Sequence, residues 1–169
     1  GIMINASEIV SSKMNFKEFK NFVFDSNKSK ISFIRFACHF NEIEKILPYI
    51  NFLKKRKVLL ILNLMQISQK SNEEIEEITK KISKSSVNVL YFADSMGSLN
   101  PDRMESIIKS IKKFWKKEIG FHAHDNIGKA LINAETSIDL GVKWIDSTIM
   151  GMGRGPGNVK TEYALIQFN

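Results

Sequence analysis

Short apolar segments recur along this chain at nearly regular intervals. Five of them begin near Ile31, Val58, Asn88, Glu118 and Val142, about 24 to 30 residues apart. Each of the first four precedes a segment with helical periodicity, and the fifth precedes a glycine-rich loop. Such spacing is typical of βαβ units, and the units are too dissimilar in sequence for a repeat array. Because the segments are apolar on both faces, the sequence predicts an α/β fold built on a parallel sheet.

Three of the intervening helices carry clear signals. Ser71–Glu74 reads as a capping box, ahead of apolar residues at helical spacing: Ile75, Ile78 and Ile82. Asn100-Pro101 predicts the start of a second helix with the buried stripe Met104, Ile108, Ile111 and Trp115. A third helix is predicted with Ile127, Leu131, Ala134 and Ile138 on its buried face, ending near Gly141. Pro48 predicts a kink or a late start in the helix after Phe40.

Two architectures suit such a chain, an open doubly wound sheet and a (β/α)₈ TIM barrel. A doubly wound sheet often has a glycine-rich phosphate loop after its first strand, and neither Ile31 nor Val58 is followed by one. A complete barrel needs about 250 residues, whereas 169 residues hold about six units. The opening Ile2–Asn5 resembles the end of a strand that begins upstream. We therefore expect residues 1–169 to form an incomplete TIM-barrel domain that is poorly soluble and inactive alone, because two strand edges are unpaired.

Composition excludes several classes of partner. The net charge is +7, but the lysines cluster at predicted helix ends, as in 54–57, 80–81 and 112–113, without interleaved aromatic residues, so no nucleic-acid partner is expected. No signal peptide and no apolar run of about 18 residues is present, so no membrane partner is expected. The single cysteine, Cys38, predicts a buried thiol and a reducing, cytoplasmic location.

Polar residues follow the predicted strands where barrel enzymes carry their active sites. They are Cys38-His39, Gln66 with Ser68, Asp94-Ser95, His122 with His124, and Asp146. Solvent exposure alone could also produce this pattern. His122-Ala-His124 is more specific, because residues i and i+2 of a strand face the same side and two imidazoles form a partial site for a divalent ion. The alternative is a pair of histidines that only fill space or form hydrogen bonds, with Asp125-Asn126 capping the next helix.

The segment 151–158 contains four glycines and one proline in eight residues. Such a loop permits positive φ angles and close approach of the backbone to a ligand or metal. It lacks the Gly-Lys-Ser/Thr of a P-loop, and an ordinary turn is the alternative. Arg154 within it could meet a carboxylate or phosphate, or could remain solvated.

Three motifs, Phe92–Gly97, Gly120–Asn126 and Asp146–Glu162, occur in an order and spacing that resembles the HMG-CoA-lyase-like metal-dependent barrels. That superfamily includes 4-hydroxy-2-oxovalerate aldolase, HMG-CoA lyase and isopropylmalate synthase. The chain is most similar to the 4-hydroxy-2-oxovalerate aldolase branch, whose glycine loop also reads Gly-Met-Gly before a Gly-Asn and a Glu. The resemblance covers the chain as about strands two to seven of the barrel, without the first strand and the C-terminal end.

The resemblance implies a role for each matching residue. His122 and His124 match the metal-binding histidines, and Asn158 matches an asparagine that completes the metal shell in the lyase branch and lies near the site in the aldolases. Ser95 matches a substrate-contacting serine, and His122 is placed beside the substrate as well. The metal implied is Mn²⁺ or Mg²⁺. Asp146 is expected to anchor the seventh strand structurally.

Parts of the family pattern are absent from this chain. The third metal ligand, an aspartate beside an enolate-stabilising arginine, has no match before position 31, and Asp102-Arg103 lies in the first turn of a predicted helix. The base histidine and a substrate-contacting tyrosine would also lie outside the chain, so the catalytic residues are not assigned. The glycine loop lacks the cysteine of HMG-CoA lyase, which argues against that activity.

The resemblance thus implies metal-dependent cleavage of a 4-hydroxy-2-oxo acid to pyruvate and an aldehyde through a metal-stabilised enolate. The alternatives are a Claisen-type acyltransferase resembling isopropylmalate synthase, and a non-catalytic barrel module. The implied partners are a small 2-oxo acid substrate and either further copies of the chain or a partner dehydrogenase.

Overall fold

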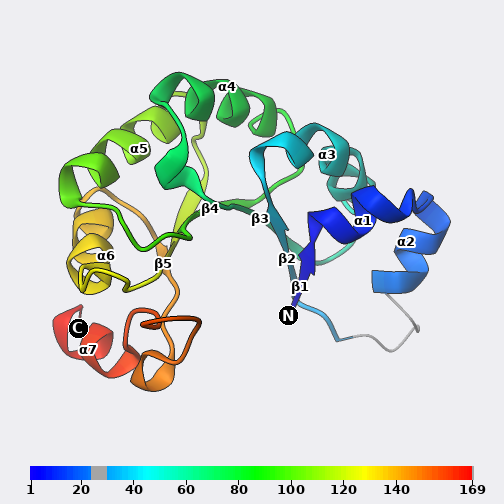
Figure 1. Ribbon diagram of the computed structural model, residues 1–169. Helices are drawn as coiled ribbons and strands as arrows, with labels where there is room; N and C mark the ends of the chain where they lie inside the picture. The colour runs from blue at the N-terminus through cyan, green and yellow to red at the C-terminus, as the bar shows by residue number, and fades with distance from the viewer. Residues whose placement is uncertain (24–29, 169) are drawn as a thin grey trace.

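One parallel six-stranded sheet forms the centre of the computed structural model, which describes residues 1–23 and 30–168 (Figure 1). The strands pair in sequence order, from β1 to β6. They are β1 (Ile2–Asn5), β2 (Phe33–Cys38), β3 (Leu59–Leu64), β4 (Val89–Asp94), β5 (Glu118–Ala123) and β6 (Trp144–Ile145). The sheet is curved, and its concave face is open in Figure 1. It forms an arc of a (β/α)₈ barrel, as the sequence predicts, and each predicted strand begins within two residues of its expected start.

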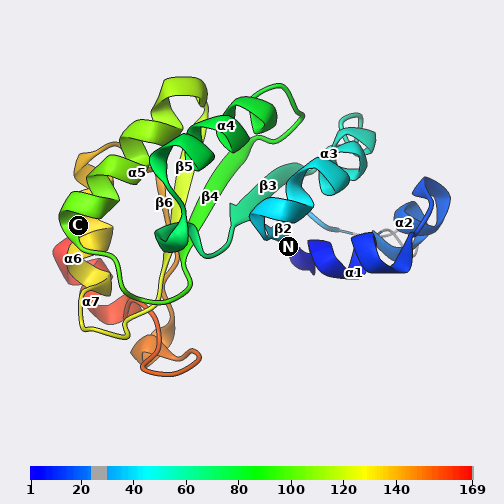
Figure 2. The ribbon, with the colours of Figure 1, turned by 45° about the horizontal axis from the view of Figure 1, so that its top comes forward.

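Helices cover the convex face of this arc (Figures 1 and 2). The α-helices are α1 (Ala6–Ser12), α2 (Phe16–Val23), α3 (Ile43–Phe52), α4 (Asn72–Ile82), α5 (Pro101–Phe114), α6 (Ala130–Asp139) and α7 (Thr161–Gln167). Three 3₁₀ turns, η1 (Phe40–Glu42), η2 (Ile67–Gln69) and η3 (Ile149–Gly151), follow the ends of β2, β3 and β6. No helix among residues 1–23 and 30–168 has the length and apolar character needed to cross a bilayer.

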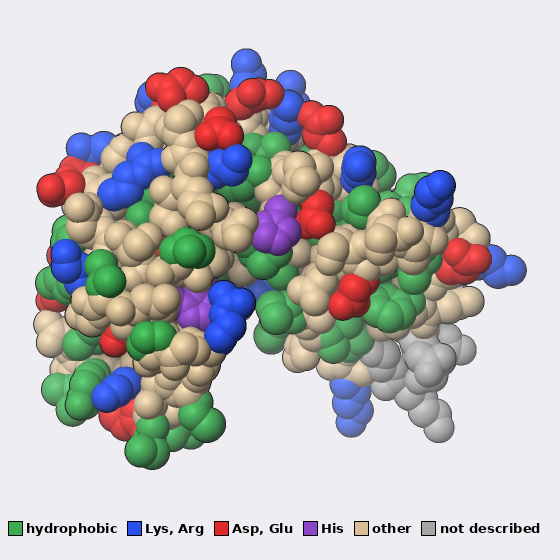
Figure 3. All heavy atoms as spheres, in the orientation of Figure 1, with side chains coloured by type: hydrophobic (Ala, Val, Ile, Leu, Met, Phe, Trp, Pro, Cys, Tyr) green, Lys and Arg blue, Asp and Glu red, His purple; other side chains and the backbone are tan. Residues whose placement is uncertain are grey.

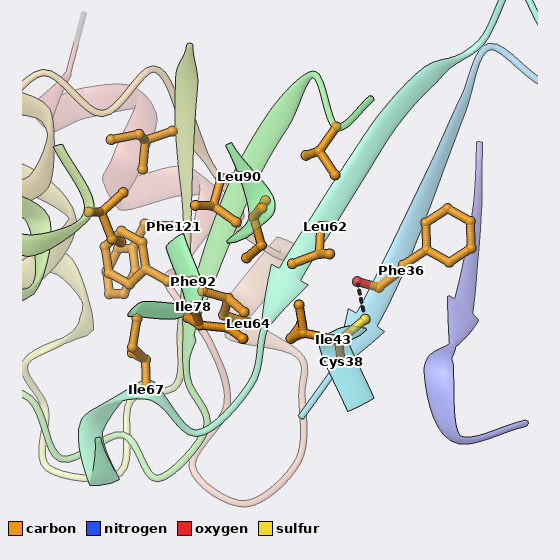
Figure 4. Packing of buried hydrophobic residues seen from close by; sticks show 14 of the residues in the cluster. Phe36, Cys38, Ile43, Leu62, Leu64, Ile67, Ile78, Leu90, Phe92 and Phe121 are labelled. Carbon is orange, nitrogen blue, oxygen red and sulfur yellow. Dashed lines mark hydrogen bonds between the residues drawn. The ribbon is translucent and has the colours of Figure 1, made fainter. Parts of the chain in front are cut away.

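The main hydrophobic core lies between the sheet and the helices. Alternate residues of each strand enter it, such as Phe36 and Cys38 of β2 and Phe92 of β4 (Figure 4). Phe92 stacks on Phe121 of β5 with ring centroids 4.9 Å apart. Cys38 is a free, fully buried thiol, so the predicted buried thiol is confirmed, and burial raises its pKa far above the usual range.

The remaining strand residues face the concave side of the sheet. A small apolar cluster of Ile61, Val89 and Tyr91 lies there. The same alternation turns Arg35 of β2 and His122 of β5 toward this face, because both have the opposite parity to the core residues on their strands. The concave face therefore carries the ionisable side chains of Arg35 and His122.

The predicted caps of α4 and α5 are confirmed. The Ser71 hydroxyl accepts a hydrogen bond from the Glu74 N–H at 3.2 Å, and the Glu74 carboxylate accepts one from the Ser71 N–H at 2.8 Å. The Asn100 side chain accepts a hydrogen bond from the Arg103 N–H at 2.8 Å. The whole predicted stripe of α5, Met104, Ile108, Ile111 and Trp115, is buried.

The prediction for α6 is wrong in its start and its buried face. The helix begins at Ala130, whose N–H donates to the Asp125 carboxylate at 2.8 Å. Ile127 and Ile138 are 52% and 36% exposed, whereas the buried face consists of Ala130, Asn133, Ala134 and Ser137. A turn through Gly128, with φ of +69°, delays the helix by three residues and rotates its apolar face. The predicted stop is confirmed, because Gly141 follows the helix with φ of +83°.

Two helical segments differ from the sequence-based expectation in other ways. Helix α3 starts at Ile43, five residues before Pro48, and continues through the proline to Phe52, so the helix does not start at Pro48. Helices α1 and α2 were not predicted, although α2 buries Phe19 and Val23.

Packing of α5 on the sheet makes a large contribution to stability. We expect Ile111→Ala to lower the free energy of unfolding by about 2 to 5 kcal/mol, because truncation of this fully buried side chain leaves a cavity in the core. Lys109→Ala on the exposed side of the same helix is the matched control, and it removes only an exposed i,i+4 ion pair with Glu105. Urea unfolding of both variants measures the difference, and equal midpoints would contradict the prediction.

Candidate metal and substrate site

Polar side chains gather where β4, β5 and β6 end on the concave face. In the space-filling view the two arms of the arc are separated by a hollow, and histidine and Lys or Arg side chains lie beside it (Figure 3). The three sequence motifs converge there. Gly97 of the first motif packs against Asn126 of the second, so closely that an added Cβ would lie 2.7 Å from the Asn126 nitrogen.

His122 of β5 and His124, one residue beyond the end of this strand, project together, as their spacing predicts. Their ring centroids are 5.1 Å apart, and the ring planes are nearly perpendicular at 88°. Burial lowers the pKa of His124, and the neighbouring His122 and Arg154 lower it further, against an opposing effect of Asp94. Because a metal binds the neutral imidazole, these surroundings favour the ligand form of His124.

Asp146 connects His122 to a distant strand. Its Oδ2 lies 2.9 Å from His122 Nδ1, and its two oxygens accept hydrogen bonds from Arg35 at 2.6 and 3.0 Å. Burial opposes ionisation of Asp146, but the hydrogen bonds and charges of His122 and Arg35 outweigh it and lower its pKa. Asp146 is therefore an ionised acceptor that contacts both Arg35 and His122. The sequence predicted only a structural role in anchoring a strand, and the contact with His122 was not predicted.

Arg35 was not predicted as a site residue. It lies in the middle of β2, and its guanidinium carbon is 3.7 Å from the centre of the Tyr91 ring. A signal was present in the sequence, because an arginine inside the apolar run Phe33–Cys38 must find a partner if that strand is buried.

The glycine loop is held in place by backbone contacts with the β5 end. His124 and Asn158 form an isolated antiparallel bridge, and the Asp125 N–H donates to the Gly157 carbonyl at 2.9 Å. Gly157 has φ of +98°, and a Cβ there would lie 2.0 Å from the Gly151 oxygen. The close approach that the glycines permit is thus used to bring Asn158 beside His124, and the loop is not a simple solvent-exposed turn.

Asn158 has one polar atom without a partner. Its Nδ2 donates to the Met152 carbonyl at 3.0 Å, whereas its buried Oδ1 has no hydrogen-bond partner among the described residues. Gly153 packs on this amide, and a Cβ there would lie 2.5 Å from Nδ2. An oriented and unpaired amide oxygen is a suitable ligand for a hard divalent cation.

Ser95 lies one residue beyond the end of β4. In register, Asp94 pairs with Ala123, so the next residues along the two strands are Ser95 and His124. The Ser95 hydroxyl accepts a hydrogen bond from the Gln66 N–H at 3.0 Å. Its own hydrogen remains available to a ligand, and Gln66 is held in a left-handed conformation with φ of +57°.

The donors present fit a divalent metal as an incomplete set. Two imidazoles lie together at the strand end and Asn158, with its unpaired amide oxygen, is bridged to His124. Residues 1–23 and 30–168 nevertheless contain no group of three His, Cys, Asp or Glu side chains that could hold a metal ion. The structure therefore brings together all four residues that the sequence singled out: Ser95, His122, His124 and Asn158. His39, at the end of β2, instead precedes η1, where its N–H donates to the Glu42 carboxylate at 2.9 Å.

Comparison with known proteins gives consistent results. The 4-hydroxy-2-oxovalerate aldolase of Brevibacillus brevis is 29% identical over 135 residues, which are 80% of this chain and 40% of that protein. The enzyme of the same name from Bacillus thuringiensis is 30% identical over 132 residues, 78% of this chain and 39% of that protein. The chain thus spans about 40% of the length of these curated relatives.

Solved structures extend the comparison to the fold. The N-terminal domain of a putative aldolase from Bacteroides vulgatus superimposes with a TM-score of 0.82 at 29% identity, covering 98% of this chain and 53% of that one. Hydroxymethylglutaryl-CoA lyase from Pseudomonas aeruginosa has a TM-score of 0.77 at 16% identity, covering 97% of this chain and 60% of that one, and shows the shared fold alone. The sequence profile of the HMGL-like family matches residues 3–168. The chain therefore belongs to the HMGL-like family.

Proposed function

We propose that this chain forms the metal- and substrate-binding part of a divalent-metal-dependent aldolase that cleaves a 4-hydroxy-2-oxo acid to pyruvate and an aldehyde. The observation that carries the proposal is the pair of neighbouring imidazoles, His122 and His124, with Asn158 bridged to His124 through the backbone and its amide oxygen unpaired. The aldolase relatives at 28 to 30% identity support the substrate class.

His122, His124 and Asn158 would hold the ion, which we infer to be Mn²⁺ or Mg²⁺. When bound, such an ion supplies Lewis-acid stabilisation for the negative charge that develops on a 2-oxo acid. His124 stays neutral at physiological pH because its pKa is lowered, so it does not repel a cation. Ser95 donates its free hydroxyl hydrogen to a substrate oxygen and so orients the substrate beside His124.

The proposed reaction breaks one carbon–carbon bond. A base takes the proton of the 4-hydroxyl group, the C3–C4 bond breaks, and the aldehyde leaves with the former hydroxyl oxygen as its carbonyl. The bonding electrons form the pyruvate enolate, and protonation at C3 yields pyruvate. We assign neither the base nor an enolate-stabilising arginine to this chain, and both terminal nitrogens of Arg35 are engaged with Asp146.

Loss of one imidazole should abolish metal binding and cleavage together. We expect His124→Ala to lower metal affinity at least about 100-fold, because it removes one of the two imidazole ligands and leaves only His122. Pyruvate release from 4-hydroxy-2-oxovalerate and metal content of the purified full-length protein are the measurements. His39→Ala is the matched control, since His39 lies at the end of a different strand. Full metal content in the His124 variant would refute the assignment.

Metal binding should depend on pH through His124. Protonation of the imidazole competes with the metal, and the lowered pKa moves this competition to a pH below the ordinary histidine value of about 6.5. Affinity for Mn²⁺ should therefore stay constant from about pH 8 to pH 7 and fall only below about pH 6.5. Calorimetric titrations across this range test the prediction, and a decline that begins above pH 7 would contradict it.

Removal of the Ser95 hydroxyl should weaken substrate orientation without affecting the metal. We expect Ser95→Ala to lower kcat/KM about 5- to 20-fold, which corresponds to one lost hydrogen bond of about 1 to 1.5 kcal/mol, while Mn²⁺ affinity changes less than about twofold. Ser68→Ala, on the turn after the neighbouring strand, is the control. Equal effects of the two substitutions would argue against contact between Ser95 and the substrate.

A further inference from the structure

An ion pair crosses the concave face from the second strand to the end of the sixth. Arg35 Nη1 and Nη2 donate to the two oxygens of Asp146 at 2.6 and 3.0 Å, which is a bidentate arrangement. The side chains are 16% and 25% exposed, so the pair is largely withdrawn from water. The residues are 111 positions apart in sequence, and β3, β4 and β5 separate the strands that carry them.

Two further residues support the guanidinium. The Tyr91 ring lies beneath it, 3.7 Å from ring centre to guanidinium carbon, in the geometry of a cation–π contact. The ring in turn lies against Gly120, where an added Cβ would be 2.2 Å from the Tyr91 Cε2 atom. Because Gly120 has no side chain, the Tyr91 ring can occupy this space. The ring packs against the guanidinium of Arg35 and supports it beside Asp146.

The same carboxylate meets a predicted metal ligand. Asp146 Oδ2 lies 2.9 Å from His122 Nδ1. An ionised carboxylate can only accept hydrogen bonds, so in the neutral form of the His122 ring, the form that binds a metal, the hydrogen belongs on Nδ1. The lone pair is then on Nε2, at the opposite side of the ring, where it is free to bind a cation.

We propose that Arg35 and Asp146 are positioning residues, which hold His122 in the tautomer with hydrogen on Nδ1 and so direct Nε2 toward the metal position. The proposal rests on the proposed metal site and deepens it. Asp146 makes the contact to His122, and Arg35 acts through Asp146 by fixing both of its oxygens. Tyr91 and Gly120 keep the guanidinium in place.

The arginine gives the carboxylate one available geometry. Without Arg35, Asp146 could rotate about its side-chain bonds and present either oxygen to His122, to solvent or to the cation itself. With both oxygens engaged by a planar fork, only the orientation that faces His122 Nδ1 remains. The expected consequence is a preformed ligand rather than one that the metal must orient.

The first test reads the tautomer directly in metal-free, full-length protein labelled with ¹⁵N-histidine. Long-range ¹H–¹⁵N spectra at about pH 8 distinguish hydrogen on Nδ1 from hydrogen on Nε2, and His122→Gln assigns the signals. We expect the Nδ1–H form of His122 in the unaltered protein and a shift toward the Nε2–H form in Asp146→Asn. An Nε2–H form in the unaltered protein, or spectra unchanged by Asp146→Asn, would overturn the proposal.

The second test measures metal affinity by titration with Mn²⁺. Asp146→Asn keeps the shape of the side chain but faces Arg35 with an amide group, and we expect affinity to fall about 10- to 100-fold. Arg35→Lys keeps the charge but cannot bind both oxygens, and we expect a smaller fall, about tenfold or less. Glu105→Gln, which removes an exposed ion pair on α5, should leave both the tautomer and the affinity unchanged.

The two tests separate this inference from the proposed function. If the unaltered protein binds no divalent metal, the proposed function fails, whereas the tautomer spectra still decide whether Asp146 positions His122. If the protein binds metal and Arg35→Lys, folded by circular dichroism, retains full affinity and the original tautomer, the role of Arg35 is excluded while the metal site stands.

Discussion

The Arg35–Asp146 ion pair is the interaction on which the concave face depends. Strand β6 is only two residues long and forms two register pairs with β5, and the Asp146 N–H continues this ladder by donating to the Phe121 carbonyl at 3.0 Å. The Asp146 side chain is fixed by two charged hydrogen bonds to β2 and by His122. Because the guanidinium is mostly buried, removal of Asp146 would leave it without a carboxylate, at a cost of several kcal/mol. This contact joins the two arms of the arc at the residue that leads into the glycine loop.

The glycine loop that follows Asp146 makes a second set of contacts, with the residues at the end of β5. From Asp146 the chain passes through η3 and returns to pair with His124 at Asn158. The return is possible because Gly157 approaches the Gly151 carbonyl too closely for any side chain, and the Asn158 N–H then donates to that carbonyl at 3.0 Å. Together with the bond from the Asp125 N–H to the Gly157 carbonyl, this bond holds the loop closed, and the buried Asn158 Oδ1 has no hydrogen-bond partner among the described residues. The loop positions Asn158 by backbone geometry, whereas the ion pair positions Asp146 beside His122 by charge.

Much of this arrangement was predictable from local patterns in the sequence. The regular apolar segments predicted the strands, and the i,i+2 spacing predicted that His122 and His124 share a face. The face of α6 was mispredicted because the turn through Gly128 follows from a hydrogen bond to Asp125, which periodicity does not reveal. Arg35 was overlooked because its partner follows a strand four positions away in the sheet, and only the curvature of the sheet brings the two together. Asn158 was assigned by resemblance to a family, since no spacing rule predicts that a loop returns to a strand end.

The surroundings of the two histidines differ, and the difference bears on the role of the aspartate beside them. Burial, His122 and Arg154 lower the pKa of His124, whereas His122 is oriented by a carboxylate. A free carboxylate at that distance would compete for the cation, because hard divalent ions prefer oxygen ligands. Arg35 occupies both oxygens of Asp146 and offsets its charge, so the proposed role of Asp146 is to direct the imidazole without entering the coordination shell. If Arg35 were absent, the freed carboxylate would be a candidate ligand, so the proposed positioning role of Asp146 depends on the arginine of β2.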